Sequence, residues 1–293
     1  MKFALISAAA ISILTTFGIL FSILFEAIEF FKLRSFWYFI TGTVWSPGVI
    51  GSQFGALPIF AGTFVITIIA LGVAIPIGLG SAIYMSEYAS PKVRDYLKPL
   101  LEILAGIPTV VYGFFAAITV APLVVKIAES VGLEATFNSA LASGVVMGIM
   151  IIPVISSLSD DVIRAVPDSQ RKAAFGLGMT HGETIKNIVL PSAMPGIISA
   201  SLLALSKALG ETMIVVMAAR ASDQTFTWNP LEDMTTVTVT IVNSLVGDFE
   251  FNSPETLSAF ALGLILFIVT LILNMISLSL IRKFKEKYKV NTL

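Results

Sequence analysis

The sequence has no cysteine in its 293 residues and only one histidine, His181. The absence of cysteine excludes disulfides, thiolate catalysis and cysteine-based zinc sites, and one histidine cannot form a multi-histidine metal site. No Gly-Lys pair occurs, so the phosphate-binding loop of many ATPases is missing. The net charge of −1 excludes the basic surface typical of nucleic-acid-binding proteins. These absences favour a conduit over a catalyst.

Charged residues are also scarce, and their distribution predicts membrane-spanning helices. They make up 13% of the chain, against about 25% in a typical soluble domain, and the mean hydropathy is +0.91. A helix needs about 20 apolar residues to cross the hydrocarbon core. The longest uncharged stretch, 35–86, is interrupted near Trp45 and at Pro58. We therefore predict six spans, near 4–26, 58–86, 99–125, 138–158, 192–219 and 256–281.

The predicted fold class is an all-α polytopic membrane protein without a separate soluble domain. We expect a first helix and an outer aromatic loop over 1–55, a core over 56–281 and a basic tail over 282–293. A signal peptide is the alternative for the first apolar stretch. That stretch exceeds the roughly 7–15 apolar residues of a signal peptide, and no small-residue cleavage site follows it, so we expect a retained helix.

The Lys and Arg residues predict that both termini are cytoplasmic, because positive charge favours that side. With the N-terminus inside, thirteen of the eighteen Lys and Arg residues fall on the inner side. Four fall on the outer side, and these are Lys32, Arg34, Lys126 and Arg220. The three tryptophans also fall on the outer side, where they are predicted to form an aromatic belt, and they are Trp37, Trp45 and Trp228.

Prolines and small residues are found inside the predicted spans. Prolines are tolerated there when neighbouring helices or water satisfy the freed carbonyls. They occur in the second to fifth spans as Pro76, Pro108, Pro153 and Pro195. In the fourth span Ala140, Gly144 and Gly148 are spaced four apart, which predicts close packing of helix backbones.

The longest predicted cytoplasmic loop, 159–191, contains signals for a short helix. Pro167 and Asp168 suit a helix start, and Ala173, Ala174 and Leu177 give that helix a small apolar face. Such a helix is suited to docking into a groove of another protein. The alternative is a helix lying on lipid, which its mixed charge argues against.

The polar residues of the same loop have simpler interpretations. His181 is predicted to be solvated or to face a partner. Asp160 and Asp161 are predicted to be a charged helix end, with a metal site as the less favoured alternative.

The loop resembles the coupling motif of ABC importer permeases, which is Glu-Ala-Ala, three residues, Gly, nine residues and Ile-x-Leu-Pro. The residues that match this motif are Ala173, Ala174, Gly178, Ile188, Leu190 and Pro191. Lys172 stands where the family usually has Glu, so any pairing by that Glu must differ here. The resemblance implies that a cytoplasmic ATPase docks on this loop and hydrolyses the ATP.

Three further segments are similar to the permeases of the phosphate-specific ABC transporter. They are 82–89 at the end of the second span, 102–113 on the third, and Gly210-Glu211-Thr212-Met213 on the fifth. The last segment resembles the PstC-type subunit. The resemblance implies a type I importer permease in a bacterial inner membrane, without a cofactor. It also implies a homologous PstA-type permease, a PstB-type ATPase dimer and a PstS-type phosphate-binding protein as partners.

Two charged residues, Lys207 and Glu211, lie near the middle of the fifth predicted span. A charge at that depth costs about 2.5–3.5 kcal/mol on insertion scales, and a spacing of four would let the two pair on one helix face. They are either a structural pair or a site for an anion, and we favour the site. The resemblance carries the same implication, although the family typically has Arg at position 207.

A net-neutral pair cannot hold phosphate by itself. The remaining groups must come from a second permease or from backbone amides at broken helices. Thr109, Tyr112 and Thr212 are the candidate neutral donors along the substrate pathway.

The predicted outer loop 221–255 has six carboxylates and no Lys or Arg. Because such a loop repels free phosphate, it favours delivery by a carrier protein. The sequence therefore predicts a permease subunit that moves inorganic phosphate inward. The alternatives are a permease for another oxyanion, such as sulfate or molybdate, and an ion-coupled secondary transporter or channel.

Overall fold

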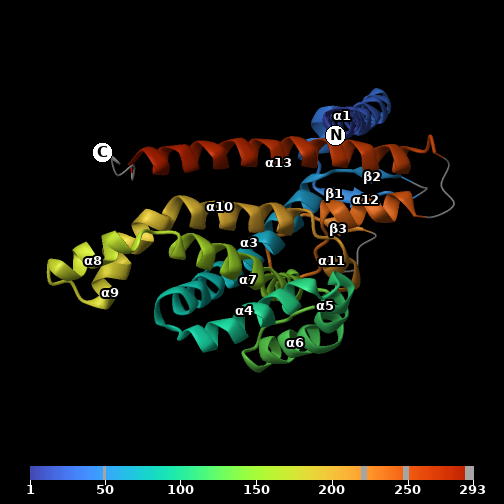
Figure 1. Ribbon diagram of the computed structural model, residues 1–293. Coiled ribbons are helices and arrows are strands. Elements are labelled where there is room, and N and C mark those ends of the chain that lie inside the picture. The colour runs from blue at the N-terminus through green and yellow to red at the C-terminus, as the bar shows by residue number, and fades with distance from the viewer. Residues whose placement is uncertain (49–50, 219–222, 247–250, 288–293) are drawn as a thin grey trace. The chain divides into compact units, whose positions relative to one another are not determined.

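The computed structural model describes residues 1–48, 51–218, 223–246 and 251–287, and the chain is mostly helical (Figure 1). The elements in order are α1 (Lys2–Leu33), α2 (Phe36–Thr41), β1 (Val44–Ser46), β2 (Gln53–Phe54), α3 (Leu57–Ile83), η1 (Tyr84–Tyr88), α4 (Pro91–Gly106), α5 (Thr109–Phe115), η2 (Ala116–Val120), α6 (Ala121–Ser130), α7 (Ala140–Arg164), α8 (Asp168–Gly176), α9 (His181–Thr184), η3 (Ile185–Val189), α10 (Leu190–Leu209), α11 (Met213–Ala218), β3 (Gln224–Thr225), α12 (Val237–Leu245) and α13 (Pro254–Lys287). The elements η1, η2 and η3 are π-helical turns.

Six helical stretches within the described residues are long and apolar enough to cross a membrane, which confirms the predicted number. They are Leu5–Leu33, Leu57–Tyr88, Thr109–Ser130, Ala140–Arg164, His181–Leu209 and Pro254–Lys283. The first is longer than predicted. Its last turns contain charged residues, and Lys32 there forms an ion pair with Glu29.

The predicted third span, 99–125, is wrong in position. Helix α4 ends at Gly106, Ile107 is extended, and α5 begins after Pro108. Proline disfavours a helical conformation in the residue before it and has no N–H to continue a helix. The apolar stretch Thr109–Ser130 therefore starts after the break. Of the four prolines predicted inside spans, Pro76, Pro153 and Pro195 lie within continuous helices.

The predicted fifth span, 192–219, is also displaced. The long stretch begins at His181 and ends at Leu209, and the short helix α11 follows after Gly210–Thr212. The cause is local, because Gly210 ends α10 and the residues after it do not continue the helix. Arg220 lies outside the described residues.

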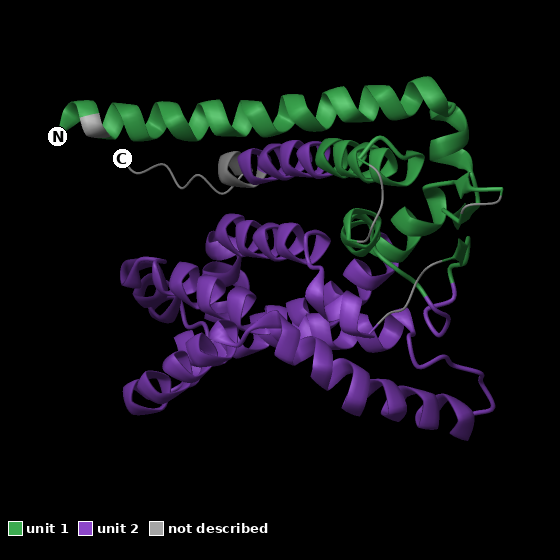
Figure 2. Cartoon of the chain, turned by 90° about the vertical axis from the view of Figure 1, so that its right-hand side faces the viewer, with its two compact units in different colours: residues 1–63, 221–228, 234–269 green, residues 64–220, 229–233, 270–293 purple. Residues whose placement is uncertain are grey.

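Two compact units are formed, and each contains segments that are distant in sequence (Figure 2). Unit 1 comprises Met1–Thr63, Ala221–Trp228 and Met234–Val269, and unit 2 comprises Phe64–Arg220, Asn229–Asp233 and Thr270–Leu293. The domain boundaries expected at residues 55 and 281 stay predictions. Part of the expected basic tail, 288–293, lies outside the described residues.

Unit 1 has an aromatic core beside a small sheet that the sequence did not predict. Strand β1 is central, with antiparallel neighbours β2 and β3, and Trp45 lies opposite Phe54. The rings of Phe30 and Phe39 pack edge to face at 5.1 Å, and Trp45 contacts Phe54 in the same way at 5.7 Å. Trp45 is only 2% exposed. Its predicted place in an aromatic belt is therefore wrong, whereas Trp37 and Trp228 are exposed.

The predicted outer loop 221–255 contains the helix α12, which starts after Thr236. Its carboxylates are divided between the units, with Asp223 and Glu255 in unit 1 and Glu232 and Asp233 in unit 2. The other two, Asp248 and Glu250, lie outside the described residues. The outer position of this acidic segment, and its repulsion of free phosphate, stay predictions.

Helix α7 is the central element of unit 2, and its small residues allow neighbouring helices to approach closely. A Cβ added at Gly144 would lie 2.7 Å from Ile69 Cβ, and one at Gly148 would lie 2.8 Å from the carbonyl oxygen of Ala70. Both contacts are with α3. The packing role predicted for Gly144 and Gly148 is therefore confirmed.

Candidate functional site

The loop after α7 folds into two short helices at one end of α7 and α10 (Figure 1). Helix α8 begins at Asp168 after Pro167, as predicted. At its end the N–H of Met179 donates to Ala174 O and the N–H of Gly178 donates to Phe175 O. This pair of bonds is a Schellman motif, which requires a left-handed residue. Gly178 supplies that residue with φ +82°.

The second short helix, α9, is fixed by a capping box. The Thr180 side chain accepts from the N–H of Glu183, and the Glu183 carboxylate accepts from the N–H of Thr180. The chain then passes through η3 into α10, which has Pro191 in its first turn. Ile188 and Leu190 of the motif are half-buried there.

The motif residues of α8 divide between the interior and the surface. Ala174 is buried, whereas Ala173 and Lys172 are exposed. Lys172 forms no ion pair with a residue that the structure describes. Phe175 and Leu177 are exposed as well, and Leu177 is 82% accessible. The exposed apolar side chains of the loop thus include Ala173, Phe175 and Leu177, whereas Ala174 packs in its interior.

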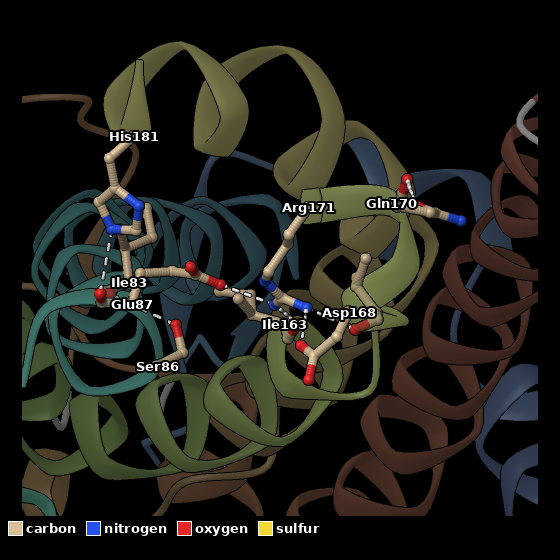
Figure 3. Close-up of polar contacts among 10 residues, drawn as sticks. Ile83, Ser86, Glu87, Ile163, Asp168, Gln170, Arg171 and His181 are labelled. Atoms are coloured by element: carbon tan, nitrogen blue, oxygen red, sulfur yellow. Dashed lines mark hydrogen bonds and ion pairs between the residues drawn. The ribbon is translucent and has the colours of Figure 1, made fainter. Parts of the chain in front are cut away.

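Arg171 connects α8 to two other elements (Figure 3). Its Nη2 donates to Glu87 Oε1 at 2.7 Å and to the carbonyl oxygen of Ile163 at 3.0 Å. Its Nη1 donates to the carbonyl oxygen of Val166. The last carbonyls of a helix have no partner within the helix. At the end of α7 the Ile163 carbonyl accepts from the Val166 N–H and also from Arg171, which pairs with η1 at the same time.

Glu87 receives a second contact from the loop. The backbone carbonyl of Glu87 lies 3.1 Å from Nε2 of His181, the first residue of α9 (Figure 3). The His181 ring also meets Tyr88 edge to face at 5.2 Å and stacks on Phe175 at 6.2 Å. The expectation of a solvated or partner-facing histidine is therefore only partly right, because one ring nitrogen contacts this chain.

A second ionic cluster joins α4 to α7. Arg94 Nη2 donates to Asp160 Oδ2 at 2.8 Å, and Lys98 Nζ donates to Asp161 Oδ1 at 2.6 Å. The hydrogen bond to Asp160 raises the pKa of Arg94. Asp160 is fully buried, so its charge needs this partner. The preference for a charged helix end over metal ligands agrees with this ion pairing.

The two charges predicted to pair in the fifth span lie on either side of its break. Lys207 is in the last turn of α10, and Glu211 Oε1 accepts from the N–H groups of Met213 and Ile214 at the start of α11. The described ion pairs do not include Lys207 with Glu211, so the predicted pairing on one helix face is wrong. A cation at a helix C-terminus and an anion at a helix N-terminus both interact favourably with the helix dipole. Lys207 remains exposed.

The break in the fifth span lies close to the start of the third. Helices α5 and α11 pack so closely that a Cβ at Gly113 would lie 2.9 Å from the carbonyl oxygen of Met213. Thr109 begins α5, and Thr212 is the residue before α11. Tyr112 is buried, and its hydroxyl donates to Leu104 O across the Pro108 break. Thr109 and Tyr112 thus belong to a helix that packs on α11, and Thr212 directly precedes α11.

The sequence alone did not predict the contacts that join α8 to α7 and η1, or those that join α4 to α7. In the sequence, Arg171 and Arg94 contribute only to the charge asymmetry that predicts the orientation. Glu87 is noted only as part of segment 82–89, which resembles phosphate permeases. Glu87 is the first charged residue after a long apolar stretch. That position was a usable signal for a carboxylate with a partner, although it did not identify Arg171.

The comparison with protein families decides the class of this chain. Residues 74–289 match the family described as the inner membrane component of binding-protein-dependent transport systems. The chain belongs to this family. Members are components of transport systems, and the six apolar stretches agree with a multi-pass inner-membrane protein. This inner membrane component is thus a transport permease and not an enzyme.

Curated relatives of this inner membrane component carry names of permeases. The phosphate transport system permease protein PstC of Mesorhizobium japonicum is 34% identical over 91% of this chain and 84% of that protein. PstC 1 of Mycobacterium tuberculosis is 32% identical over 84% and 82%. The probable ABC transporter permease protein YqgH of Bacillus subtilis is 32% identical over 86% and 78%.

Solved structures support the fold of this inner membrane component. A bacterial ABC transporter involved in the import of the polysaccharide alginate has a chain similar over 95% of both, with a TM-score of 0.66 and 16% identity. A chain of the MetNI methionine ABC transporter covers 78% of this one with a TM-score of 0.52. The all-α, type I ABC importer permease fold is confirmed.

Proposed function

We propose that this chain is the membrane-spanning permease subunit of an ATP-driven importer of inorganic phosphate. The observation that carries the proposal is the identity of 32–34% to proteins named PstC, over more than four-fifths of each chain. Segments 82–89, 102–113 and 210–213 resemble the same permeases.

The proposal assigns the exposed surface of the α8–α9 loop to a cytoplasmic ATPase. Its support is the match of Ala173, Gly178 and Leu190 to the coupling motif, together with the exposure of Phe175 and Leu177. The further partners would be a homologous permease of the PstA type, a PstB-type ATPase dimer and a PstS-type binding protein. Cytoplasmic termini belong to the same proposal.

The substrate pathway is proposed to pass the region where α5 packs on α11. Lys207 is the candidate for contact with the anion, because it is an exposed cation on a span. Glu211 serves as the N-terminal cap of α11 in this assignment. Thr109 and Thr212 are candidate neutral donors along the same pathway, and the Tyr112 hydroxyl donates to Leu104 O across the Pro108 break.

Uptake of radiolabelled phosphate into cells that produce the complete transporter tests the proposal. We expect uptake that requires ATP, survives an uncoupler and is competed by arsenate but not by sulfate. We also expect an ATPase and a second permease to copurify with this chain. Competition by sulfate or molybdate instead would assign another oxyanion, and uptake abolished by the uncoupler alone would assign a secondary transporter.

A further inference from the structure

One guanidinium group holds together three elements at the inner end of unit 2. Arg171 lies on α8, its ion-pair partner Glu87 lies on η1, and its carbonyl partner Ile163 lies on α7 (Figure 3). The second and fourth apolar stretches end at Tyr88 and Arg164. The ends of both stretches are therefore attached to the same side chain of the coupling loop.

The ion pair in this joint is shielded from solvent. The Glu87 side chain is 5% exposed and that of Arg171 is 15% exposed. Arg171 also approaches Asp168, but at 3.4 Å and with a carboxylate that is 83% exposed. A buried ion pair loses much more than an exposed one when a partner is removed. Of the two carboxylates that pair with Arg171, Glu87 is therefore expected to contribute more to the stability of the joint. The exposed Asp168 serves as the control.

The α8–α9 loop contacts Glu87 at two points, the side-chain carboxylate and the backbone carbonyl. Arg171 of α8 binds its carboxylate, and His181 of α9 contacts its backbone carbonyl. Glu87 belongs to a π-helical turn, a geometry that is rare and often marks functional positions. A force applied to α8 therefore reaches η1 through the Glu87 side chain, and a force applied to α9 reaches it through the Glu87 backbone carbonyl.

We propose that Arg171 and Glu87 are positioning residues that transmit displacement of the coupling helix α8 to the inner ends of the second and fourth spans. This inference rests on the proposed function, since it requires an ATPase that moves α8. Without the joint, the ATPase would still dock on Ala173, Phe175 and Leu177, but its movement would not be passed on. ATP hydrolysis would then be uncoupled from transport.

Three variants of the complete transporter, reconstituted in proteoliposomes, test the inference. Glu87→Gln keeps the shape of the side chain and removes its charge. Arg171→Lys keeps the charge but cannot bind a carboxylate and two carbonyls from one planar group. Asp168→Asn is the control, because it removes the exposed partner of the same guanidinium. Phosphate moved per ATP hydrolysed is measured for each assembled complex, so differences in yield do not enter.

We expect Glu87→Gln and Arg171→Lys to lower this ratio about tenfold, within the roughly 5–150-fold range typical of coupling between sites. The rate of ATP hydrolysis should stay within about twofold of the wild type, and Asp168→Asn should keep the wild-type ratio. A merely structural joint would lower the yield of complex and leave the ratio unchanged. A wild-type ratio in both joint variants, or an equal loss in Asp168→Asn, would overturn the inference.

Hydrogen exchange separates failure of the inference from failure of the proposed function. The backbone amides of 168–179 are followed in the wild-type chain and in Glu87→Gln, in nanodiscs and without substrate. We expect exchange about tenfold faster in the variant, because local opening there is no longer opposed by the ion pair. Unchanged exchange would overturn the joint even if phosphate is transported. A wild-type transporter that moves no phosphate, with faster exchange in the variant, would refute the proposed function and leave the contact intact.

Discussion

Gly178 has a backbone conformation that other residues adopt only at a cost, while the space around it is open. Its φ is +82°, and a Cβ added there would meet no atom within 4 Å. We predict that Gly178→Ala destabilises the loop by about 1–2 kcal/mol, the cost of a left-handed conformation for an L-residue. Gly178→Asn should lose less, because Asn tolerates this conformation. Hydrogen exchange of the amides of 171–179 measures both, with the helical Gly176→Ala as the control.

The same pair of variants separates two roles of Gly178. The coupling motif suggests that glycine permits close approach of an ATPase, and the structure adds a conformational requirement. If transport is lost in Gly178→Ala and kept in Gly178→Asn, the left-handed backbone conformation is the reason that glycine is needed at this position. Loss in both variants with normal exchange would support close approach.

Lys207 offers a test of the substrate pathway at a single side chain. It is exposed and has no ion pair with a described residue, so removing its charge should change stability by no more than about 0.5 kcal/mol. We predict that Lys207→Met assembles normally and lowers phosphate uptake at least about tenfold, whereas Lys207→Arg keeps most activity because the charge remains. Uptake per assembled complex is the measurement. Wild-type uptake by Lys207→Met would remove Lys207 from the pathway.

The contacts of Glu211 change how a double replacement must be interpreted. Because its carboxylate caps α11, Glu211→Leu removes a cap worth about 0.5–2 kcal/mol in addition to a charge. A loss of uptake in Lys207→Met with Glu211→Leu would therefore mix two causes. The single Lys207 variants are the cleaner comparison.

Single residues were predictable where a local rule applies. The helix start at Pro167 and Asp168 follows from neighbouring residues, whereas Gly178 follows only from the resemblance to the coupling motif. The contact of Arg171 with Glu87 joins residues 84 positions apart, and no local rule specifies it. The predicted pairing of Lys207 with Glu211 is wrong for another reason, because it assumed a helix that continues past Gly210.

At the scale of elements, the packing of α7 on α3 depends on backbone proximity. A Cβ at Gly148 would lie 2.8 Å from both Ala70 O and Val73 Cβ, and a carbonyl oxygen in a helix cannot move aside. We predict that Gly148→Ala destabilises the chain by about 1–3 kcal/mol, as overpacking does. Thermal unfolding in detergent measures this effect.

The control for this substitution is on the partner helix. Gly80 lies in α3, and a Cβ there would meet nothing within 4 Å. Gly80→Ala should therefore be neutral or stabilise the helix by up to about 1 kcal/mol. An unfolding temperature lowered equally by both substitutions would contradict the packing argument.

Two cations of α4, Arg94 and Lys98, form ion pairs with α7, and we expect Arg94 to contribute most of the stability. Arg94→Gln leaves the fully buried Asp160 without its close partner, and we predict a loss of about 3–5 kcal/mol. Lys98→Gln should cost no more than about 1 kcal/mol, because Lys98 mainly pairs with the half-exposed Asp161. Unfolding by denaturant compares the two variants. Equal losses would show that Asp160 does not depend on Arg94.

The elements themselves were predictable in number but less so in position. Long apolar stretches identify spans, because only apolar side chains are stable in the hydrocarbon core of the bilayer. The described residues contain six such stretches. Uncharged residues do not distinguish a span from the apolar face of an amphipathic helix, and α4 has such a face with Tyr96, Leu100 and Ile103 exposed. The third span was therefore extended into α4, although Pro108 marked the real start.

For the whole molecule, the orientation in the membrane is the main untested prediction. The chain has no cysteine, so a single introduced thiol can be labelled without interference. We predict that Phe137→Cys reacts with an impermeant maleimide in intact cells, because the loop before α7 is expected outside. Leu177→Cys, on the α8 loop, should react only after the membrane is opened. Both side chains are exposed, at 60% and 82%, and the opposite labelling pattern would invert the topology.

The division into two units was not predictable from composition. Unit 1 combines the first 63 residues with 221–228 and 234–269, which include parts of the predicted outer loop and of the last predicted span. Hydropathy treats Trp45 like any other aromatic residue outside a span, whereas its burial depends on Phe54 and Phe39 closing around it. Such a core is a property of the tertiary structure.

The small sheet of unit 1 has a consequence for the order of events during synthesis. Strand β1 at Val44–Ser46 needs β3 at Gln224–Thr225 as its second neighbour. A ribosome that adds about 5–20 residues per second delivers β3 roughly ten seconds or more after β1. During that delay four further spans must enter the bilayer, while one edge of β1 is available to any passing strand. Unit 1 can therefore be completed only late in biogenesis, after most of unit 2 has been made.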